Sequence, residues 1–214
     1  MKKIITALLF LLFTLLPVSA EKVMPEKVDH KNTRTIGVYQ VSNNIELYRN
    51  ADENSEIIAK IKWNKNEITP ENFTFRNTFI VFIPNKSLAL MQVTDETEEW
   101  VEVIYNNLTG DKGWIKKDDP YKFSTWINFY NMYGKKYGLY ILKGSPESIK
   151  LMKSGTDNQS QTVATMNLPS KINLNAIRGN WALVSVLDLD KSPKTGYIEW
   201  RSPDGVKYLF PDIK

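Results

Sequence analysis

Apolar and polar residues alternate along most of this chain in short runs separated by polar turns. Apolar side chains fall on every second position in 36–41 and 45–50, and further short apolar runs occupy 57–61, 100–105 and 113–115. Alternation with a period of two is typical of half-buried β-strands, in which successive side chains point to opposite faces. The pattern therefore predicts an all-β protein of short strands joined by tight turns.

This pattern occurs twice. The first copy begins at Gly37 with GVYQVSNN-IELYRNADENSEIIAKI, and the second begins at Gly138 with GLYILKGSPESIKLMKSGTDNQSQTVATM. Each copy later has a strand that begins with Trp and, after a hairpin, a strand that begins with Gly and an aromatic residue. These strands are Trp100–Tyr105 and Gly113–Ile115 in the first copy, and Trp181–Val186 and Gly196–Ile198 in the second. A repeat of this size predicts two domains of one architecture.

The first copy contains an insertion, because the interval from Ala59 to Trp100 is much longer than the equivalent interval from Ala164 to Trp181. Within about 63–99, the residues from Thr78 to Val93 are strongly β-prone on both sides of the turn Pro84–Ser87, which predicts an inserted hairpin. Such a hairpin either extends the sheet of its own domain or serves as a specificity loop.

The segment 118–136 between the two copies has aromatic residues at helical spacing. We expect a short amphipathic helix, with Asp119 as its cap, Pro120 in its first turn and Gly134 at its end. Its aromatic face either packs between the domains or forms a partner-binding surface. The residues of that face are Trp126, Phe129, Tyr130 and Tyr133.

The N-terminal residues 1–20 have the features of a secretory signal peptide. Lys2 and Lys3 precede an apolar stretch from Ile4 to Leu16, and small residues precede a cleavage site between Ala20 and Glu21. We therefore expect an exported protein, periplasmic or extracellular, without an integral membrane segment after cleavage. The polar residues 21–35 are expected to form a flexible tether.

The composition excludes several kinds of chemistry. The chain has no Cys and a single His, so it has no disulfides, no Cys nucleophile and no multi-His metal site, and we expect no cofactor. The net charge of +4 includes Lys2 and Lys3, and the rest of the chain has no long Lys/Arg run, which argues against nucleic-acid binding. We expect a monomer.

The two copies resemble the bacterial Src-homology-3-like (SH3-like) domain, a small β-barrel common in exported cell-envelope proteins. The segments that match this family are IELYRNADENSEIIAKI with WVEVIYNNLTGDKGWI, and IKLMKSGTDNQSQTVATM with WALVSVLDLDKSPKTGYI, about two-thirds of the mature chain. The second copy departs from the pattern, with Tyr197 where Trp is usual. The resemblance implies two tandem barrels, 36–117 and 137–214, joined by the helical linker 118–136. The aromatic residues expected in their cores are Trp100, Trp114, Trp181 and Tyr197.

The resemblance also implies a binding function, with cell-wall peptide or glycan (peptidoglycan) as the expected ligand and an envelope protein as the alternative partner of a scaffold or assembly protein. An aromatic groove in the first copy is the expected site. Its candidate residues are Tyr48, Trp63, Tyr105 and Trp114. We do not expect an enzyme, because the carboxylates clustered at 95–99 and 118–119 lie in polar turns, with no apolar pocket to raise a pKa.

Overall fold

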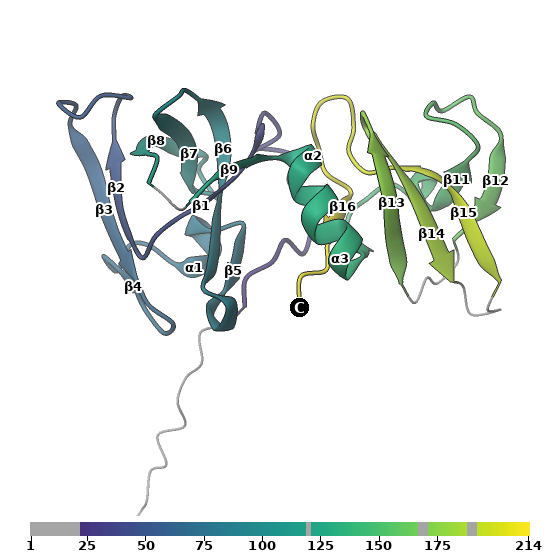
Figure 1. Cartoon of the computed structure of the whole chain (residues 1–214), viewed down its shortest axis with the longest axis horizontal. Coiled ribbons are helices and arrows are strands. Elements are labelled where there is room, and N and C mark those ends of the chain that lie inside the picture. The colour runs from purple at the N-terminus through teal and green to yellow at the C-terminus, as the bar shows by residue number, and fades with distance from the viewer. Residues whose placement is uncertain (1–21, 119–120, 167–170, 188–191) are drawn as a thin grey trace, which may run out of the picture.

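The computed structural model describes residues 22–118, 121–166, 171–187 and 192–214. Two antiparallel sheets, one from each copy of the repeat, lie at opposite ends of the molecule with a helix between them (Figure 1). The prediction of an all-β protein is therefore confirmed. The predicted signal peptide, with Ala20 and Glu21 at its cleavage site, lies outside the described residues.

The first sheet has the strand order β4-β3-β2-β8-β7-β6-β1-β9, with β5 paired to β6. We call this part of the chain the first module. Strands β6, β7 and β8 form a meander, and β1 lies between β6 and β9. The strands are β1 Gly37–Gln40, β2 Asn44–Tyr48, β3 Ile57–Trp63, β4 Ile68–Thr69, β5 Val81–Ile83, β6 Leu88–Glu96, β7 Trp100–Asn106, β8 Asp111–Lys116 and β9 Phe123–Thr125.

The second sheet has the order β12-β11-β15-β14-β13-β10-β16, and we call it the second module. Its seven strands among the described residues follow the same path as β3-β2-β8-β7-β6-β1-β9, so the duplication seen in the sequence is also a duplication of topology. A 3-10 turn, η3 Glu147–Lys150, precedes β11. The strands are β10 Leu139–Ile141, β11 Leu151–Lys153, β12 Thr162–Thr165, β13 Ile172–Arg178, β14 Trp181–Leu187, β15 Pro193–Glu199 and β16 Leu209–Pro211.

The insertion in the first module occupies a narrower range than the predicted 63–99. Strand β6 corresponds to β13 of the second module, so the inserted residues are 64–87 and the predicted hairpin is only partly an addition. Within them, β4 extends the sheet along β3, and Phe82 meets the ring of Trp63 of β3 edge-on with ring centroids 5.3 Å apart. The insertion therefore packs on its own module. It contains β4, α1 Phe75–Thr78, β5 and η1 Pro84–Lys86.

The core of the first module is aliphatic along its central strands, and the aromatic residues of the repeat lie elsewhere. Gly113 and Ile115 of β8 face the core, so Trp114 between them faces outward, since side chains alternate along a strand. Trp181 and Tyr197 are likewise only half-buried, and Trp100 lies outside both core clusters. The expectation of a core position is therefore wrong for Trp114, Trp181 and Tyr197, which lie on the outer face of their strands, whereas Trp100 is buried at 6% exposure.

A continuous helix follows β9 and connects the modules. It comprises α2 Trp126–Phe129, the π-helical turn η2 Tyr130–Gly134 and α3 Lys135–Tyr137. Thr125 caps it, accepting a hydrogen bond from the backbone N–H of Asn128 at 3.3 Å. The helix therefore starts later than predicted, and it ends at Gly138, whose φ of +85° suits glycine, and not at Gly134. Of the predicted caps, Asp119 and Pro120 lie outside the described residues.

The two modules share one hydrophobic core through this helix. Trp126, Phe129 and Tyr130 are at most 1% exposed. They pack in one cluster with residues of both modules, among them Leu90 of the first and Phe210 of the second. Figure 1 shows the helix between the two sheets. Because the core is continuous, we expect the modules to unfold together.

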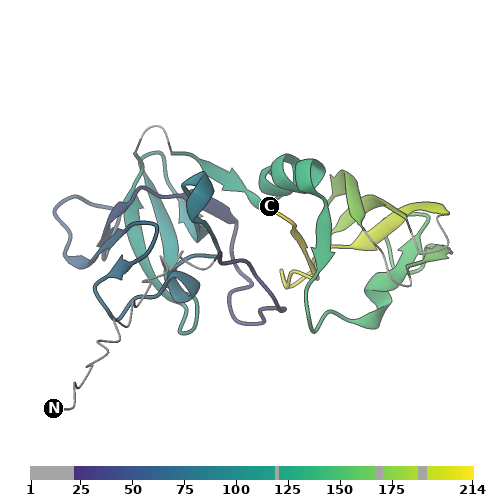
Figure 2. The ribbon, with the colours of Figure 1, turned by 90° about the horizontal axis from the view of Figure 1, so that it is seen from below.

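The segment 22–35 also connects the modules, and we call it the arm. The backbones of Val23 and Phe82 exchange two hydrogen bonds of 2.9 Å in the first module, and the N–H of Val28 donates to the carbonyl of Lys143 of the second module at 3.0 Å. Val23 and Val28 are both buried. Figure 2 shows this segment running between the modules. The prediction of a flexible tether is wrong here, because two isolated apolar residues anchor the arm.

Lys207 lies where the arm, the helix and the second module meet. Its ammonium donates a hydrogen bond to Thr35 Oγ1 at 3.1 Å and lies 4.0 Å from the centroid of the Trp126 ring. The pKa of Lys207 is lowered to about 7, mainly by burial and also by the positive charge of Arg201, whereas the negative charge of Asp29 opposes this shift. The cation–π contact favours the protonated form and so opposes the burial.

Lys207 should make stability depend on pH. Its pKa is lower in the folded than in the unfolded state, so above about pH 7 the unfolded chain binds more protons and the free energy of unfolding rises with pH. Between pH 7 and pH 9 we expect wild type to gain on the order of 1 kcal/mol relative to Lys207→Met. Urea denaturation of both proteins measures this, and equal changes in the two proteins would contradict it.

Candidate functional site

Of the four aromatic residues predicted to form a groove, the structure brings only Tyr48 and Trp114 together. Tyr48 and Trp114 are cross-strand neighbours on the outer face of the first sheet, where the Tyr48 ring meets Trp100 edge-on at 5.2 Å. Trp63 instead packs edge-on against Phe82 at 5.3 Å and donates its indole N–H to the carbonyl of Ser42. Tyr105 lies near Phe73 of the insertion. Trp63 and Tyr105 therefore pack against residues of the insertion and do not extend the pair formed by Tyr48 and Trp114.

The aromatic residues proposed for partner binding are mostly inaccessible. Trp126, Phe129 and Tyr130 belong to the core shared by the modules, and the Tyr130 hydroxyl donates to the carbonyl of Leu209. Tyr133 is half-buried beside Phe129. The prediction of a partner-binding aromatic face is therefore corrected for the three buried residues, since they pack between the modules. Met132, which is 61% exposed, lies on the solvent side of the helix.

A hollow of about 150 Å³ lies in the first module between the β1–β2 turn, the outer side of β2 and the end of β8. Three tyrosines line it, and side chains of both charges lie among them. The backbone N–H of Asp118 donates to the Tyr39 hydroxyl at 2.9 Å, which holds the chain after β8 against β1. The residues of this hollow used below are Tyr39, Tyr48, Tyr121, Glu46, Lys116 and Asp118.

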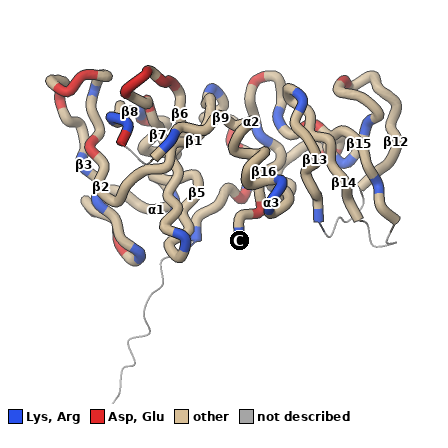
Figure 3. The backbone as a smooth tube through the Cα atoms, in the orientation of Figure 1, with Lys and Arg blue, Asp and Glu red and all other residues tan. Residues whose placement is uncertain are grey.

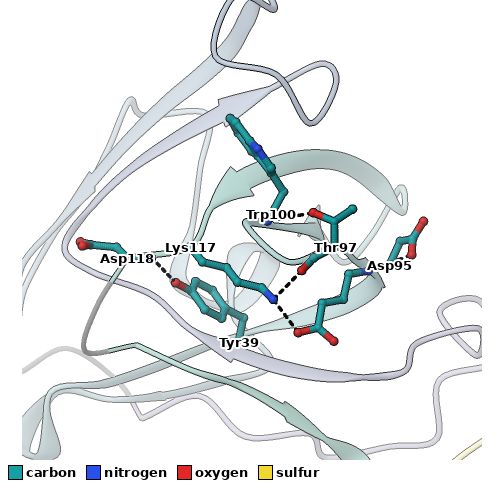
Figure 4. Close-up of polar contacts among 7 residues, drawn as sticks. Tyr39, Asp95, Thr97, Trp100, Lys117 and Asp118 are labelled. Carbon is teal, nitrogen blue, oxygen red and sulfur yellow. Dashed lines mark hydrogen bonds and ion pairs between the residues drawn. The ribbon is translucent and has the colours of Figure 1, made fainter.

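A second hollow, of about 530 Å³, adjoins the first, and both are lined by Lys116, Asp118 and Tyr121. We call the two together the first-module groove. Beyond the shared residues the groove extends to the acidic turn between β6 and β7, where Glu96, Glu98 and Glu99 line it. Figure 4 shows this region, in which the Lys117 ammonium donates to Glu96 and to the carbonyl of Thr97, each at 2.6 Å. The turn is thereby fixed against the chain segment directly after β8.

Hydrogen bonds favour the charged forms of two groups in the groove, Glu46 and Lys116. The pKa of Glu46 is lowered by hydrogen bonds from Lys60 at 2.6 Å and from the Tyr48 hydroxyl at 3.0 Å. A hydrogen bond to Glu53 raises the pKa of the Lys116 ammonium. Figure 3 shows acidic residues at the turns that end β2 and β6. The groove therefore presents both signs of charge around aromatic rings.

Sequence reasoning identified one of the three tyrosines, Tyr48, and missed Tyr39 and Tyr121. Tyr39 occupies a core-facing strand position, and Tyr121 lies in a connection that no motif distinguishes. Only the strand order brings both beside the end of β8. Within the described ranges no group of three or more His, Cys, Asp or Glu side chains is placed to hold a metal ion. None of the described helices is long and apolar enough to span a membrane.

Comparison with protein-family models, with curated proteins and with solved structures finds no match to this chain.

Proposed function

We propose that the protein is a non-catalytic binding protein of the bacterial cell envelope, built from two SH3-like modules, that recognises the peptide part of cell-wall material. The observation that carries this proposal is the first-module groove, in which Lys116, Asp118 and Tyr121 join two hollows of about 150 and 530 Å³. Binding pockets of this size combine apolar walls with a few fixed polar groups. On this proposal the predicted signal peptide directs export.

The charge pattern of the groove favours a peptide over a neutral glycan. Glu46 and Asp118 offer carboxylates and Lys116 offers an ammonium within one lining. Wall peptides carry free carboxylates and amines, so a ligand of this class can be complementary to both signs. The rings of Tyr48 and Tyr121, both half-buried, provide contact area at a low cost in side-chain entropy.

The strand order supports the SH3-like proposal. In each module a meander of three strands is preceded by two strands joined across a polar loop, and the first and last strands of the module pair with each other. The Trp-led strands, β7 and β14, are the middle strands of the meanders, and the Gly-aromatic strands, β8 and β15, follow them. This arrangement agrees with the order of the segments that carry the resemblance.

Co-sedimentation of residues 21–214 with purified peptidoglycan sacculi tests the proposal. We expect saturable pelleting of wild type, and about tenfold weaker binding after the double substitution Lys116→Gln and Asp118→Asn, since each removes a charged contact in the groove. The matched control is Lys112→Gln with Asp111→Asn, which makes the same changes at the other end of β8. The control should pellet like wild type.

Two outcomes would contradict the proposal. Equal loss in the groove variant and the control would mean non-specific attraction of charges. No pelleting of wild type would favour the alternative, a scaffold or assembly protein that binds an envelope protein. For that alternative the specific observation is an apolar groove of about 670 Å³ between β1 and the helix, with Val38, Leu90 and Met132 in its lining.

A further inference from the structure

The second module has a hollow of about 160 Å³ at the place equivalent to the first-module groove. The register fixes the correspondence. Trp100 pairs with Lys116 at the start of β7 and the end of β8, and Trp181 pairs with Glu199 at the start of β14 and the end of β15. At the same place in the fold, one module thus has a cation and the other a carboxylate. The lining residues are Pro146, Ser148, Ile149, Leu151, Lys153, Asn158, Trp181 and Glu199.

The tryptophan that begins the Trp-led strand is covered in the first module, where it is Trp100, and more accessible in the second, where it is Trp181. Trp100 is only 6% exposed, and the ring of Tyr48 meets it edge-on. In the second module Lys153 occupies the position of Tyr48, as the cross-strand neighbour of the Gly-aromatic strand. The Lys153 ammonium donates to Thr162 Oγ1 on β12 at 3.1 Å, and Trp181 remains half-buried in the lining of the hollow.

The carboxylate of Glu199 has no hydrogen-bond or ion-pair partner within the described part of the chain. Its first-module counterpart, Lys116, is paired with Glu53. Burial raises the pKa of Glu199, because the folded protein takes the carboxylate partly out of water and none of the described residues places a positive charge or hydrogen-bond donor beside it. A bound cation would stabilise the charged form of Glu199.

The other cations of this face are already engaged. Arg178 lies with its guanidinium 5.7 Å from the centroid of the Tyr197 ring, and Lys150 forms an ion pair with Glu147 at 2.7 Å. Neither lines the hollow, and Lys153 has the bond to β12 described above. An unpaired carboxylate beside an accessible indole can bind an organic cation in two ways. The carboxylate attracts the positive charge, and the indole ring adds a cation–π contact.

We propose that this hollow binds the cationic side chain of a peptide, an alkylammonium or a guanidinium, with Glu199 as the counter-charge and Trp181 as the aromatic platform. The site stands on its own geometry and does not depend on wall binding by the first module. The two modules would then select groups of different charge, which a simple duplication of one site would not do.

Titration of the ¹⁵N-labelled protein, residues 21–214, followed through the indole N–H resonance of Trp181, tests this site. The probes are Nα-acetyl-lysine amide, Nα-acetyl-arginine amide and the uncharged Nα-acetyl-norleucine amide. We expect a saturable shift with one or both cationic probes and none with norleucine. The cation that binds more tightly identifies the ligand group. Glu199→Gln should weaken binding by about tenfold, and Glu147→Gln, an exposed carboxylate of the same module, should not.

An equal shift with norleucine, unchanged binding by Glu199→Gln, or no saturable shift would each overturn the proposal. The spectrum of Glu199→Gln shows whether that variant is folded. If it is not, binding of the cationic probes to wild type at low and high salt replaces it, since a charge-based site must weaken with salt. The result is separable from sedimentation with sacculi, which tests the groove of the first module.

Discussion

Trp126→Ala should destabilise the protein by roughly 3–5 kcal/mol, the range for truncation of a large buried aromatic residue. The ring is 1% exposed and lies edge-on to Phe129 and Phe210, with centroids 5.7 and 6.4 Å apart. The substitution also removes the indole N–H that donates to the carbonyl of Thr35 at 2.9 Å. Urea denaturation followed by circular dichroism measures the loss.

The control is Met132→Ala on the same helix. Met132 is 61% exposed, so its truncation should change the free energy of unfolding by no more than about 0.5 kcal/mol. Wild type should unfold in one transition, because both modules share the core around Trp126. Two separate transitions in wild type, or similar losses in the two variants, would show that the helix does not unite the modules.

Gly205→Ala should cost at least about 2 kcal/mol more than Gly144→Ala. Both glycines have a φ of +90°, so both substitutions carry the same backbone strain. A methyl group on Gly205 would lie 2.4 Å from the carbonyl oxygen of Thr33 in the arm, whereas the nearest atom at Gly144 is 4.0 Å away. The difference between the two variants therefore measures the contact between the second module and the arm.

The same denaturation experiment compares these two glycine variants. Limited proteolysis gives a second readout, since Gly205→Ala should expose the arm to cleavage near Thr33 before the modules are attacked. Equal free energies of unfolding for Gly205→Ala and Gly144→Ala would mean that the arm can move away from residue 205 without a loss of stability. The proposed anchoring of the arm would then be wrong.

Local patterns in the sequence were sufficient for the repeat and for many of the strands, but not for β4, β9 or β16. Alternation marks β2, and the Trp-led and Gly-aromatic runs mark β7, β8, β14 and β15, because these signals come from residues adjacent in the chain. The strand parity of Trp114 was also readable, since Gly113 and Ile115 on either side of it are the core-facing residues of that strand. Expecting every large aromatic side chain in the core led to the wrong interpretation.

The docking of the arm and the position of the groove depend on contacts between residues far apart in the sequence, which no local pattern encodes. Val23 and Val28 are single apolar residues in a polar segment, and they are buried only because Phe82 and Lys143 provide backbone partners. The candidate groove depends on the same kind of information, since Tyr39 and Tyr121 meet through the pairing of β1 with β9. The unpaired Glu199 became informative only through its register with Trp181 and the contrast with Lys116.

The arm gives the molecule a closed topology with consequences for the order in which it folds. Lys22, at the beginning of the described chain, donates a hydrogen bond to the carbonyl of Ile213, a separation of 191 residues. Contacts so distant in sequence form late and slow the overall folding rate, because the chain must pay the loop-closure entropy first. Lys22 therefore finds its partner only after the last strand has been synthesised, whereas Val23 can pair with Phe82 as soon as the first module is complete. A nascent or truncated chain should hold the arm only partly docked.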